Sequence, residues 1–242
     1  MLALSGLAVA YSGWSYLPDW GWGDGDLSFE PMDDPPGFRR LAAGESTAGF
    51  DLFVGLEKRD VAHLADAEAE VRADFRHALY GDPATSSDIV PIAFFSDYYC
   101  APCRIQTRTL TALEARHPDN LKIVWRELPE LGEPSILAAK AALAAKRQGA
   151  YAAFHERLMK SSFQVTPGYI EMLAESIGVD HARLVSDMQS TEIARELESS
   201  AAIARILAFI GTPAIVIGHT VIQGLVDDKT LMKIVALEKE RG

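Results

Sequence analysis

Residues 94–104 read FFSDYYCAPCR and contain both cysteines of the chain, Cys100 and Cys103. The apolar run from Ile89 to Ser96 is short and bounded by polar residues, which predicts a buried strand. The stretch from Ala101 to Arg116 predicts a helix that ends at a His-Pro pair. A strand would therefore deliver the first cysteine to the N-terminus of a helix.

A cysteine at a helix N-terminus is suited to thiol–disulfide chemistry. Free N–H groups and partial positive charge at this end of a helix stabilise a thiolate, which is the nucleophile. Because only two residues separate the cysteines, the pair can cycle between dithiol and disulfide through a mixed disulfide. We expect Cys100 to be the exposed attacking sulfur, with a pKa below the value of about 8.5 of a free thiol. Cys103, one turn into the helix, is expected to be the buried resolving sulfur.

Three other roles for a cysteine pair explain the sequence less well. A zinc site would need two further ligands, and the six histidines are scattered without paired spacing, so no metal is expected. A structural disulfide that closes so short a loop would remove little chain entropy. Two unpaired core cysteines would not need this placement. Redox chemistry is therefore the leading interpretation.

Composition excludes several other classes of protein. The 242 residues are 48% hydrophobic and 24% charged, which is ordinary for a globular protein and excludes overall disorder. Lys and Arg number 23 against 34 Asp and Glu, so the net charge of −11 argues against a nucleic-acid partner. Two cysteines are too few for a multi-disulfide scaffold.

The chain beyond the cysteines alternates strand and helix patterns. Three more strands and a last helix are predicted at Leu121–Leu128, Ala214–Ile217, Thr220–Gln223 and Lys229–Glu240. Helical segments without a convincing strand lie between them, at Ser135–Gln148, Tyr151–Met159, Tyr169–Ile177, His181–Met188 and Thr191–Ile210. Pro213 opens an apolar strand, where it cannot donate a ladder hydrogen bond, and such a proline is often cis.

The first 88 residues have a different character. Residues 1–18 carry no charge but are short for a membrane span of about 20 residues. They predict a signal or membrane-anchor segment, the alternatives being a cleaved signal peptide, an uncut anchor and a buried terminus of a cytosolic protein. Residues 19–56 are rich in Gly, Pro and Asp and predict an irregular linker. Residues 57–82 predict one N-terminal helix.

These motifs resemble the DsbA family of thiol–disulfide oxidoreductases. The matching segments are FFSDYYCAPCR, the strand end RELP at 126–129, LGEPSILAAKAALAA at 131–145 and GTPAIVIG at 211–218. The resemblance covers about residues 89–241. It implies an α/β, thioredoxin-like fold whose main domain comprises 89–132 and 211–242. An all-helical domain would be inserted at 133–210, and the helix at 57–82 would be an N-terminal extension.

The resemblance also implies roles for individual residues. Cys100 matches the nucleophile and Cys103 the resolving cysteine of the family. Pro213 matches the cis-proline and Thr212 the residue before it, which together would bind substrate.

The chain departs from the pattern of thioredoxin-fold enzymes at the proton-transfer site. Many of these enzymes carry a buried acid six residues before the nucleophile, where this chain has Phe94. The candidates for proton transfer are therefore Glu127 and Asp97. The alternatives are that Glu127 is an exposed strand-end carboxylate and that Asp97 only caps the turn. The Ala-Pro dipeptide between the cysteines contains no histidine, and Pro102 has no N–H for a thiolate, which indicates a milder oxidant than family members with histidine there.

The function that this resemblance implies is oxidation of cysteine pairs in exported proteins, without a cofactor. The expected partners are cysteine-containing exported proteins and a membrane or periplasmic redox partner. The expected location is the periplasm, with the protein soluble or anchored to the inner membrane by its N-terminal segment. Two alternatives are a disulfide reductase or isomerase, for which the helix at 57–82 would supply a dimerising segment, and a peptide-binding chaperone that uses the cleft by strand pairing.

Overall fold

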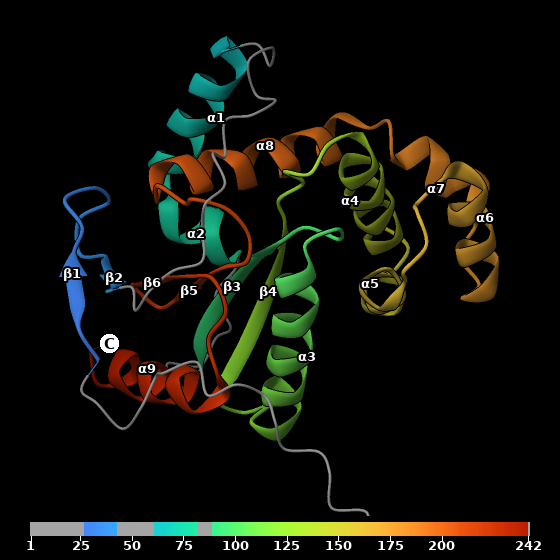
Figure 1. Cartoon of the computed structure of the whole chain (residues 1–242). Helices are drawn as coiled ribbons and strands as arrows, with labels where there is room; N and C mark the ends of the chain where they lie inside the picture. Colours follow the sequence, from blue (N-terminus) through green and yellow to red (C-terminus); the bar gives the residue numbers. More distant parts are fainter. Residues whose placement is uncertain (1–26, 43–60, 82–88, 242) are drawn as a thin grey trace, which may run out of the picture.

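A mixed β-sheet organises the residues described by the computed structural model, which are 27–42, 61–81 and 89–241. Its six strands lie in the order β1-β2-β6-β5-β3-β4 (Figure 1). Their bounds are β1 Phe29–Pro31, β2 Arg39–Leu41, β3 Val90–Ser96, β4 Leu121–Glu127, β5 Ala214–Ile217 and β6 Thr220–Gln223. β3 pairs in parallel with β4 and antiparallel with β5, so it lies inside the sheet.

Helices surround this sheet. Their bounds are α1 Val61–Ala73, α2 Phe75–Tyr80, α3 Ala101–Arg116, α4 Glu133–Lys146, α5 Tyr151–Lys160, α6 Pro167–Ser176, α7 His181–Asp187, α8 Thr191–Ile206 and α9 Asp228–Arg241. Figure 1 shows α3 and α9 on one face of the sheet and α1, α2 and part of α8 on the other. Helices α4 to α7 form a separate group beside α3.

The sequence of β3 explains its central place. Strand side chains alternate between the two faces, and this strand is apolar on both. Ile92 and Phe94 pack with α3 and α9, whereas Ala93 and Phe95 pack with α2 and α8. All four side chains are completely buried.

Helix α8 links the helical group to the sheet. Near its N-terminus, Ile193 packs into the core of α4 to α7. Near its C-terminus, Ile203 and Ile206 pack into the core beneath β3 and β5. The helical insertion expected at 133–210 is therefore continuous with the sheet domain at its second end.

The predicted fold class is confirmed, and most predicted elements recur within a few residues. Of the described residues, the N-terminal part differs most from prediction. One helix was expected over 57–82, but α1 and α2 are separated at Asp74, whose carboxylate caps α2 by accepting the N–H of His77 at 3.0 Å. The expected apolar face of this segment is covered within the chain, since Val71 and Leu79 are buried beside α8.

The prediction of an irregular linker over 19–56 is wrong for residues 27–42. Their strands β1 and β2 pair antiparallel, and β2 adds in parallel to the edge of β6. Local composition could not predict this, because three-residue strands gain their stability from tertiary contacts. The signal or membrane-anchor segment predicted at residues 1–18 lies outside the described residues. Among the described residues, no helix is both long and apolar enough to cross a membrane.

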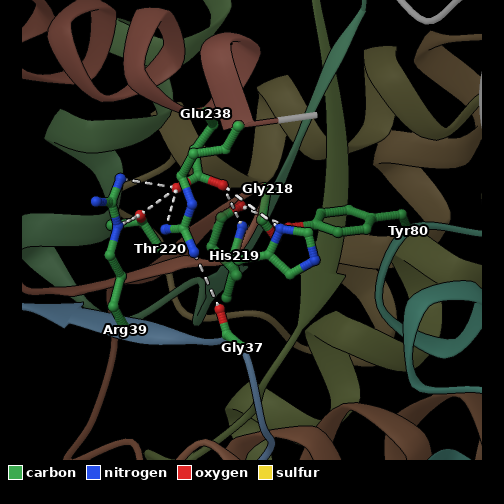
Figure 2. A network of polar contacts seen from close by, with 9 residues as sticks. Gly37, Arg39, Tyr80, Gly218, His219, Thr220 and Glu238 are labelled. Atoms are coloured by element: carbon green, nitrogen blue, oxygen red, sulfur yellow. Dashed lines mark hydrogen bonds and ion pairs between the residues drawn. The ribbon is translucent and has the colours of Figure 1, made fainter. Parts of the chain in front are cut away.

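A buried carboxylate fastens this hairpin to the C-terminal helix (Figure 2). Glu238 of α9 accepts hydrogen bonds from Arg39 at 2.9 Å, from the Thr220 hydroxyl at 2.7 Å and from the His219 N–H at 2.8 Å. Its side chain is only 2% exposed. The turn at Gly218 makes room for it, because a Cβ there would lie 2.4 Å from the carboxylate, and its φ of +55° favours glycine.

Glu238 should make the stability of the fold depend on pH. Burial raises its pKa, but the hydrogen bonds from His219 and Thr220 outweigh burial and hold the pKa at about 2. A pKa below the unfolded value gives stability that is full above about pH 4.5 and is lost as the pH falls towards 2. Glu238→Gln should therefore lower the free energy of unfolding at pH 7 by up to about 3 kcal/mol, and should weaken its fall between pH 7 and pH 3.

Urea unfolding at both pH values measures this change. Glu240→Gln, on the exposed surface of the same helix, is the matched control and should unfold like the native chain. An unchanged pH dependence in Glu238→Gln would contradict the assignment.

Candidate active site

The cysteines lie where β3 gives way to α3, as the sequence predicts. Cys100 is the N-cap of α3, and its sulfur accepts the backbone N–H of Cys103 at 3.2 Å. A sulfur thus takes the place of the oxygen that usually caps a helix. The two sulfurs are joined in a disulfide with a Cα–Cα distance of 5.2 Å.

The exposure of the two cysteines only partly follows the prediction. Cys103 is completely buried, as expected, but Cys100 is only 6% exposed rather than open to solvent. The reason is the loop before β5, where the carbonyl oxygen of Thr212 lies 3.4 Å from the Cys100 sulfur. This oxygen faces a disulfide sulfur here and would be able to accept a hydrogen bond from a Cys100 thiol after reduction.

The loop before β5 has the predicted cis peptide bond between Thr212 and Pro213. The carbonyl of Pro213 accepts the N–H of Gly224 at 2.9 Å, and Gln223 accepts the N–H of Ile210 at 2.7 Å, so both sides of the loop are held. Within the described part of the chain, the N–H of Thr212 has no hydrogen-bond partner. The loop thus offers a free N–H beside the sulfur.

Phe94, six residues before Cys100, is an ordinary core residue. It is completely buried and packs in one apolar cluster with both cysteines. Its ring meets that of Trp125 edge-on at 5.6 Å. The surroundings of Cys103 are therefore apolar on this side, which disfavours a charged sulfur there.

Asp97 anchors the turn before Cys100. One of its oxygens accepts the N–H of Tyr99 at 2.7 Å and the hydroxyl of Ser135 at 2.8 Å. The other accepts the N–H groups of Glu130 and Leu131 at 2.8 and 3.0 Å. With four hydrogen bonds, none of them to a sulfur, Asp97 joins the turn to the start of the helical group.

Glu127 is not an exposed strand-end carboxylate, since its side chain is 1% exposed. One of its oxygens accepts hydrogen bonds from Tyr98 and Tyr151, each at 2.7 Å. His155 lies beside them, with Nδ1 2.9 Å from the Tyr98 hydroxyl oxygen and 3.8 Å from the Glu127 carboxylate. No hydrogen bond of the described residues joins Glu127 to a sulfur, so any proton it exchanges with one would pass through another group.

Sequence reasoning missed Tyr98, Tyr151 and His155 as parts of this buried polar cluster. The distances along the chain, 57 residues from Tyr98 to His155 and 24 from Glu127 to Tyr151, leave no local signal. The spacing of Tyr151 and His155 by four residues on a predicted helix is a weak signal that they share a face.

Arg104 ties the connection between α5 and α6 to the cysteine turn. Its guanidinium donates to the carbonyl oxygens of Tyr98, at 2.8 Å, and of Ser161. The hydroxyl of Tyr99 accepts the N–H of Val165 at 2.7 Å. This connection is therefore held beside the turn.

Exposed apolar side chains occur on several segments that reach this site. Ile105 is 45% exposed two residues after Cys103, and Ile210 is 43% exposed two residues before Thr212. Phe163, on the connection that Arg104 holds, is 72% exposed. Large apolar side chains exposed to water favour contact with another polypeptide.

The cysteine site has no metal-binding cluster, because the described residues contain no group of three or more His, Cys, Asp or Glu side chains able to hold a metal ion. A cavity of about 300 Å³ lies elsewhere, between the N-terminal hairpin and α2, with Phe38, Tyr80 and His219 among its walls.

The chain is similar to known proteins in sequence and in structure. Residues 91–236, more than half of the chain, match the family model of the DSBA-like thioredoxin domain. No match was found among curated proteins.

Several solved structures are similar. A thioredoxin-like oxidoreductase from Silicibacter pomeroyi DSS-3 is 34% identical with a TM-score of 0.63, over 68% of this chain and 98% of that one. The catalytic domain of Proteus mirabilis ScsC is 27% identical with a TM-score of 0.60, over 72% and 98%. A periplasmic thioredoxin-like protein from Salmonella enterica serovar Typhimurium is 26% identical with a TM-score of 0.57, over 68% and 95%.

The hydrogen bonds of Asp97 predict the effect of an isosteric change. Asp97→Asn would replace one acceptor oxygen by an NH₂ group, which would face either the two N–H groups of Glu130 and Leu131 or the N–H of Tyr99 with the hydroxyl of Ser135. We expect the free energy of unfolding to fall by about 2–4 kcal/mol, because buried donors lose their partner. Asp119→Asn on the exposed surface is the control. Equal stability of the two variants in urea unfolding would show that the network does not hold the turn.

Proposed function

Because the chain belongs to the family of DSBA-like thioredoxin domains and is a thiol–disulfide oxidoreductase, we propose that it oxidises cysteine pairs in exported proteins. In this proposal Cys100 is the nucleophile and Cys103 the resolving cysteine. Reduction and isomerisation of disulfides are the alternative directions of the same chemistry.

One observation carries the proposed direction. The Cys103 N–H points at the Cys100 sulfur from a distance of 3.2 Å at the N-terminus of a sixteen-residue helix. This donor and the helix dipole stabilise a Cys100 thiolate, which exists only in the reduced protein. A reduced form that is stabilised in this way makes the disulfide a stronger oxidant, and about 30 mV corresponds to about 1.4 kcal/mol.

The reaction proceeds by two exchanges. A client thiolate attacks the Cys100 sulfur, the bond between the two cysteines breaks, and Cys103 takes the electron pair and one proton. A second client thiolate then attacks the client sulfur of the mixed disulfide, which forms the client disulfide and releases Cys100 as a thiolate. The client has lost two electrons, which reduce the Cys100–Cys103 disulfide, and two protons. One proton is on Cys103 and the other has passed to solvent. Glu127 would assist the proton of Cys103 only indirectly, because its carboxylate is bonded to Tyr98 and Tyr151.

The proposed client is an unfolded polypeptide. The N–H of Thr212 could pair with the backbone of an extended chain, with Pro213 fixing the direction of the loop. Ile105, Phe163 and Ile210 offer apolar contacts that do not depend on one client sequence. Such contacts suit a protein that meets many partners before they fold.

The proposed location is the periplasm, where disulfides persist. The similar Salmonella protein is described as periplasmic, and residues 1–18 of this chain carry no charge. A membrane or periplasmic protein that reoxidises the cysteine pair would complete the cycle. The same segment would either be removed on export or anchor the protein to the inner membrane.

Trapping of the mixed disulfide tests the roles of the cysteines. Cys103→Ser, mixed with an oxidised cysteine-containing peptide, should form a stable covalent adduct through Cys100, because no resolving sulfur remains. Cys100→Ser is the matched control and should form far less adduct at neutral pH. Non-reducing electrophoresis and mass spectrometry measure both. More adduct with Cys100→Ser would reverse the assigned roles.

A thermal comparison of the two redox forms tests the direction. We expect the reduced protein to melt at a higher temperature than the disulfide form, because the thiolate stabilises the reduced fold. A higher melting temperature for the disulfide form, together with better repair of mispaired disulfides than formation of new ones, would favour the isomerase or reductase.

A further inference from the structure

A buried polar cluster of Tyr98, Glu127, Tyr151 and His155 lies between the sheet and the helical group. One ring nitrogen of His155 in this cluster has no hydrogen-bond partner among the described residues. Tyr98 and Tyr151 each have one hydroxyl proton, and both hydroxyls lie 2.7 Å from the same Glu127 oxygen. With Glu127 as a carboxylate, both protons are donated to it. His155 Nδ1 lies 2.9 Å from the Tyr98 hydroxyl oxygen and 3.3 Å from that of Tyr151, and with both hydroxyl protons donated to Glu127 it must carry the hydrogen of these contacts.

This assignment leaves Nε2 of His155 as the basic atom of the ring. Nε2 is buried and has no hydrogen-bond partner among the described residues, and neither has the second oxygen of Glu127. The His155 side chain as a whole is only 6% exposed. A proton on Nε2 would produce an imidazolium whose Nδ1 lies 3.8 Å from the Glu127 carboxylate.

The two tyrosines that contact His155 stay uncharged near neutral pH. Burial, and next the Glu127 carboxylate, raise the pKa of both Tyr98 and Tyr151 well above the ordinary value, so they remain hydroxyl donors. The charged groups on neighbouring elements that bear on the cluster are Glu127 of β4, Asp97 of the turn, Arg104 of α3 and Glu196 of α8. The imidazole is the group whose ordinary titration falls in this range.

Two short paths connect His155 to the cysteines. The first runs through Tyr98, which lies two residues before Cys100 and whose carbonyl is held by Arg104. The second runs through Trp125, whose ring centroid lies 4.8 Å from that of His155. Trp125 meets Phe94 at 5.6 Å, and Phe94 packs in the cluster that contains both sulfurs. A charge on His155 therefore acts on the site across protein interior rather than water.

We propose that His155 is a positioning residue of the redox site, which acts through Tyr98 and Glu127 and whose protonation makes the Cys100 thiol more acidic. The inference rests on the proposed role of Cys100 as the attacking sulfur. Coupling between two sites is reciprocal, so formation of the Cys100 thiolate must in turn tighten the binding of the proton to His155. The disulfide carries no charge and cannot have this effect.

An NMR titration of the imidazole nitrogens in the native protein tests this coupling without any client. The titration midpoint of His155 should move to higher pH when the disulfide is reduced, by an affinity change of at least about twofold. Tyr98→Phe, which removes the shorter of the two hydroxyl contacts of His155 Nδ1 and leaves that of Tyr151, should reduce the difference between the two redox forms. A midpoint that is equal in both forms, or a ring that does not titrate in either, would overturn the proposal.

A second measurement distinguishes an effect of His155 on the acidity of the Cys100 thiol from a purely structural role of His155. His155→Asn keeps an N–H donor for Tyr98 but cannot be protonated. In the reduced variant, ultraviolet absorption should show that the Cys100 thiolate forms at higher pH than in the native protein. His181→Asn, which removes a histidine from α7, is the matched control and should leave the thiolate titration in place. A purely structural His155 would change the melting temperature but not this titration.

The outcome can be told apart from failure of the proposed function. If Cys100 is not the attacking sulfur, the trapping experiment fails with Cys103→Ser whatever His155 does. If Cys100 is trapped normally but the His155 midpoint ignores the redox state, only the present inference is wrong. Should His155→Asn fail to fold, the NMR comparison of the native redox forms still decides the question.

Discussion

The close approach of the Cys100 sulfur to the carbonyl of Thr212, at 3.4 Å and 112 residues apart in the chain, is the constraint on which the site depends. It requires that β3 and β5 be neighbours, since the first delivers the cysteine and the second the cis-proline loop. The antiparallel pairing of these strands brings the end of one to the start of the other. Of the chain between them, β4 stays in the sheet beside β3, whereas α4 to α8 leave the sheet and return to it before β5.

Three buried carboxylates hold the parts of the molecule together in different ways. Asp97 binds backbone N–H groups and a hydroxyl, and so fixes a turn. Glu238 binds Arg39 across the sheet edge and joins the N-terminal hairpin to the last helix. Glu127 binds two neutral hydroxyls and approaches a histidine, and one of its oxygens has no partner among the described residues. Both oxygens of Asp97 and both oxygens of Glu238 accept hydrogen bonds, which suits anchoring. Glu127 instead keeps one buried oxygen that accepts no hydrogen bond from the described residues.

The parts of the fold that could be predicted from sequence are those with local causes. The continuous apolar run of β3, the cysteine at the start of α3 and the proline at the start of β5 each carry their signal within a few residues. The hairpin of β1 and β2 could not be predicted, because it is held by the hydrogen bond from Arg39 to Glu238, and these residues are 199 positions apart in the sequence. The break at Asp74 depends on one capping hydrogen bond, which a pattern of apolar residues does not show.

The same distinction applies to the site. Both cysteines and Pro213 follow from a motif and its position, whereas the surroundings of Glu127 come from three separate segments. The helical group meets the cysteine turn through polar contacts as well as apolar ones, namely Ser135 to Asp97 and Tyr151 to Glu127. Apolar packing responds little to a change of charge, but a buried hydrogen bond to a carboxylate responds strongly because the local dielectric is low. A charge that appears at Cys100 on reduction therefore acts most strongly on the polar contacts between the sheet and the helical group. The cluster around His155 belongs to this boundary, and Nε2 of His155 has no hydrogen-bond partner among the described residues.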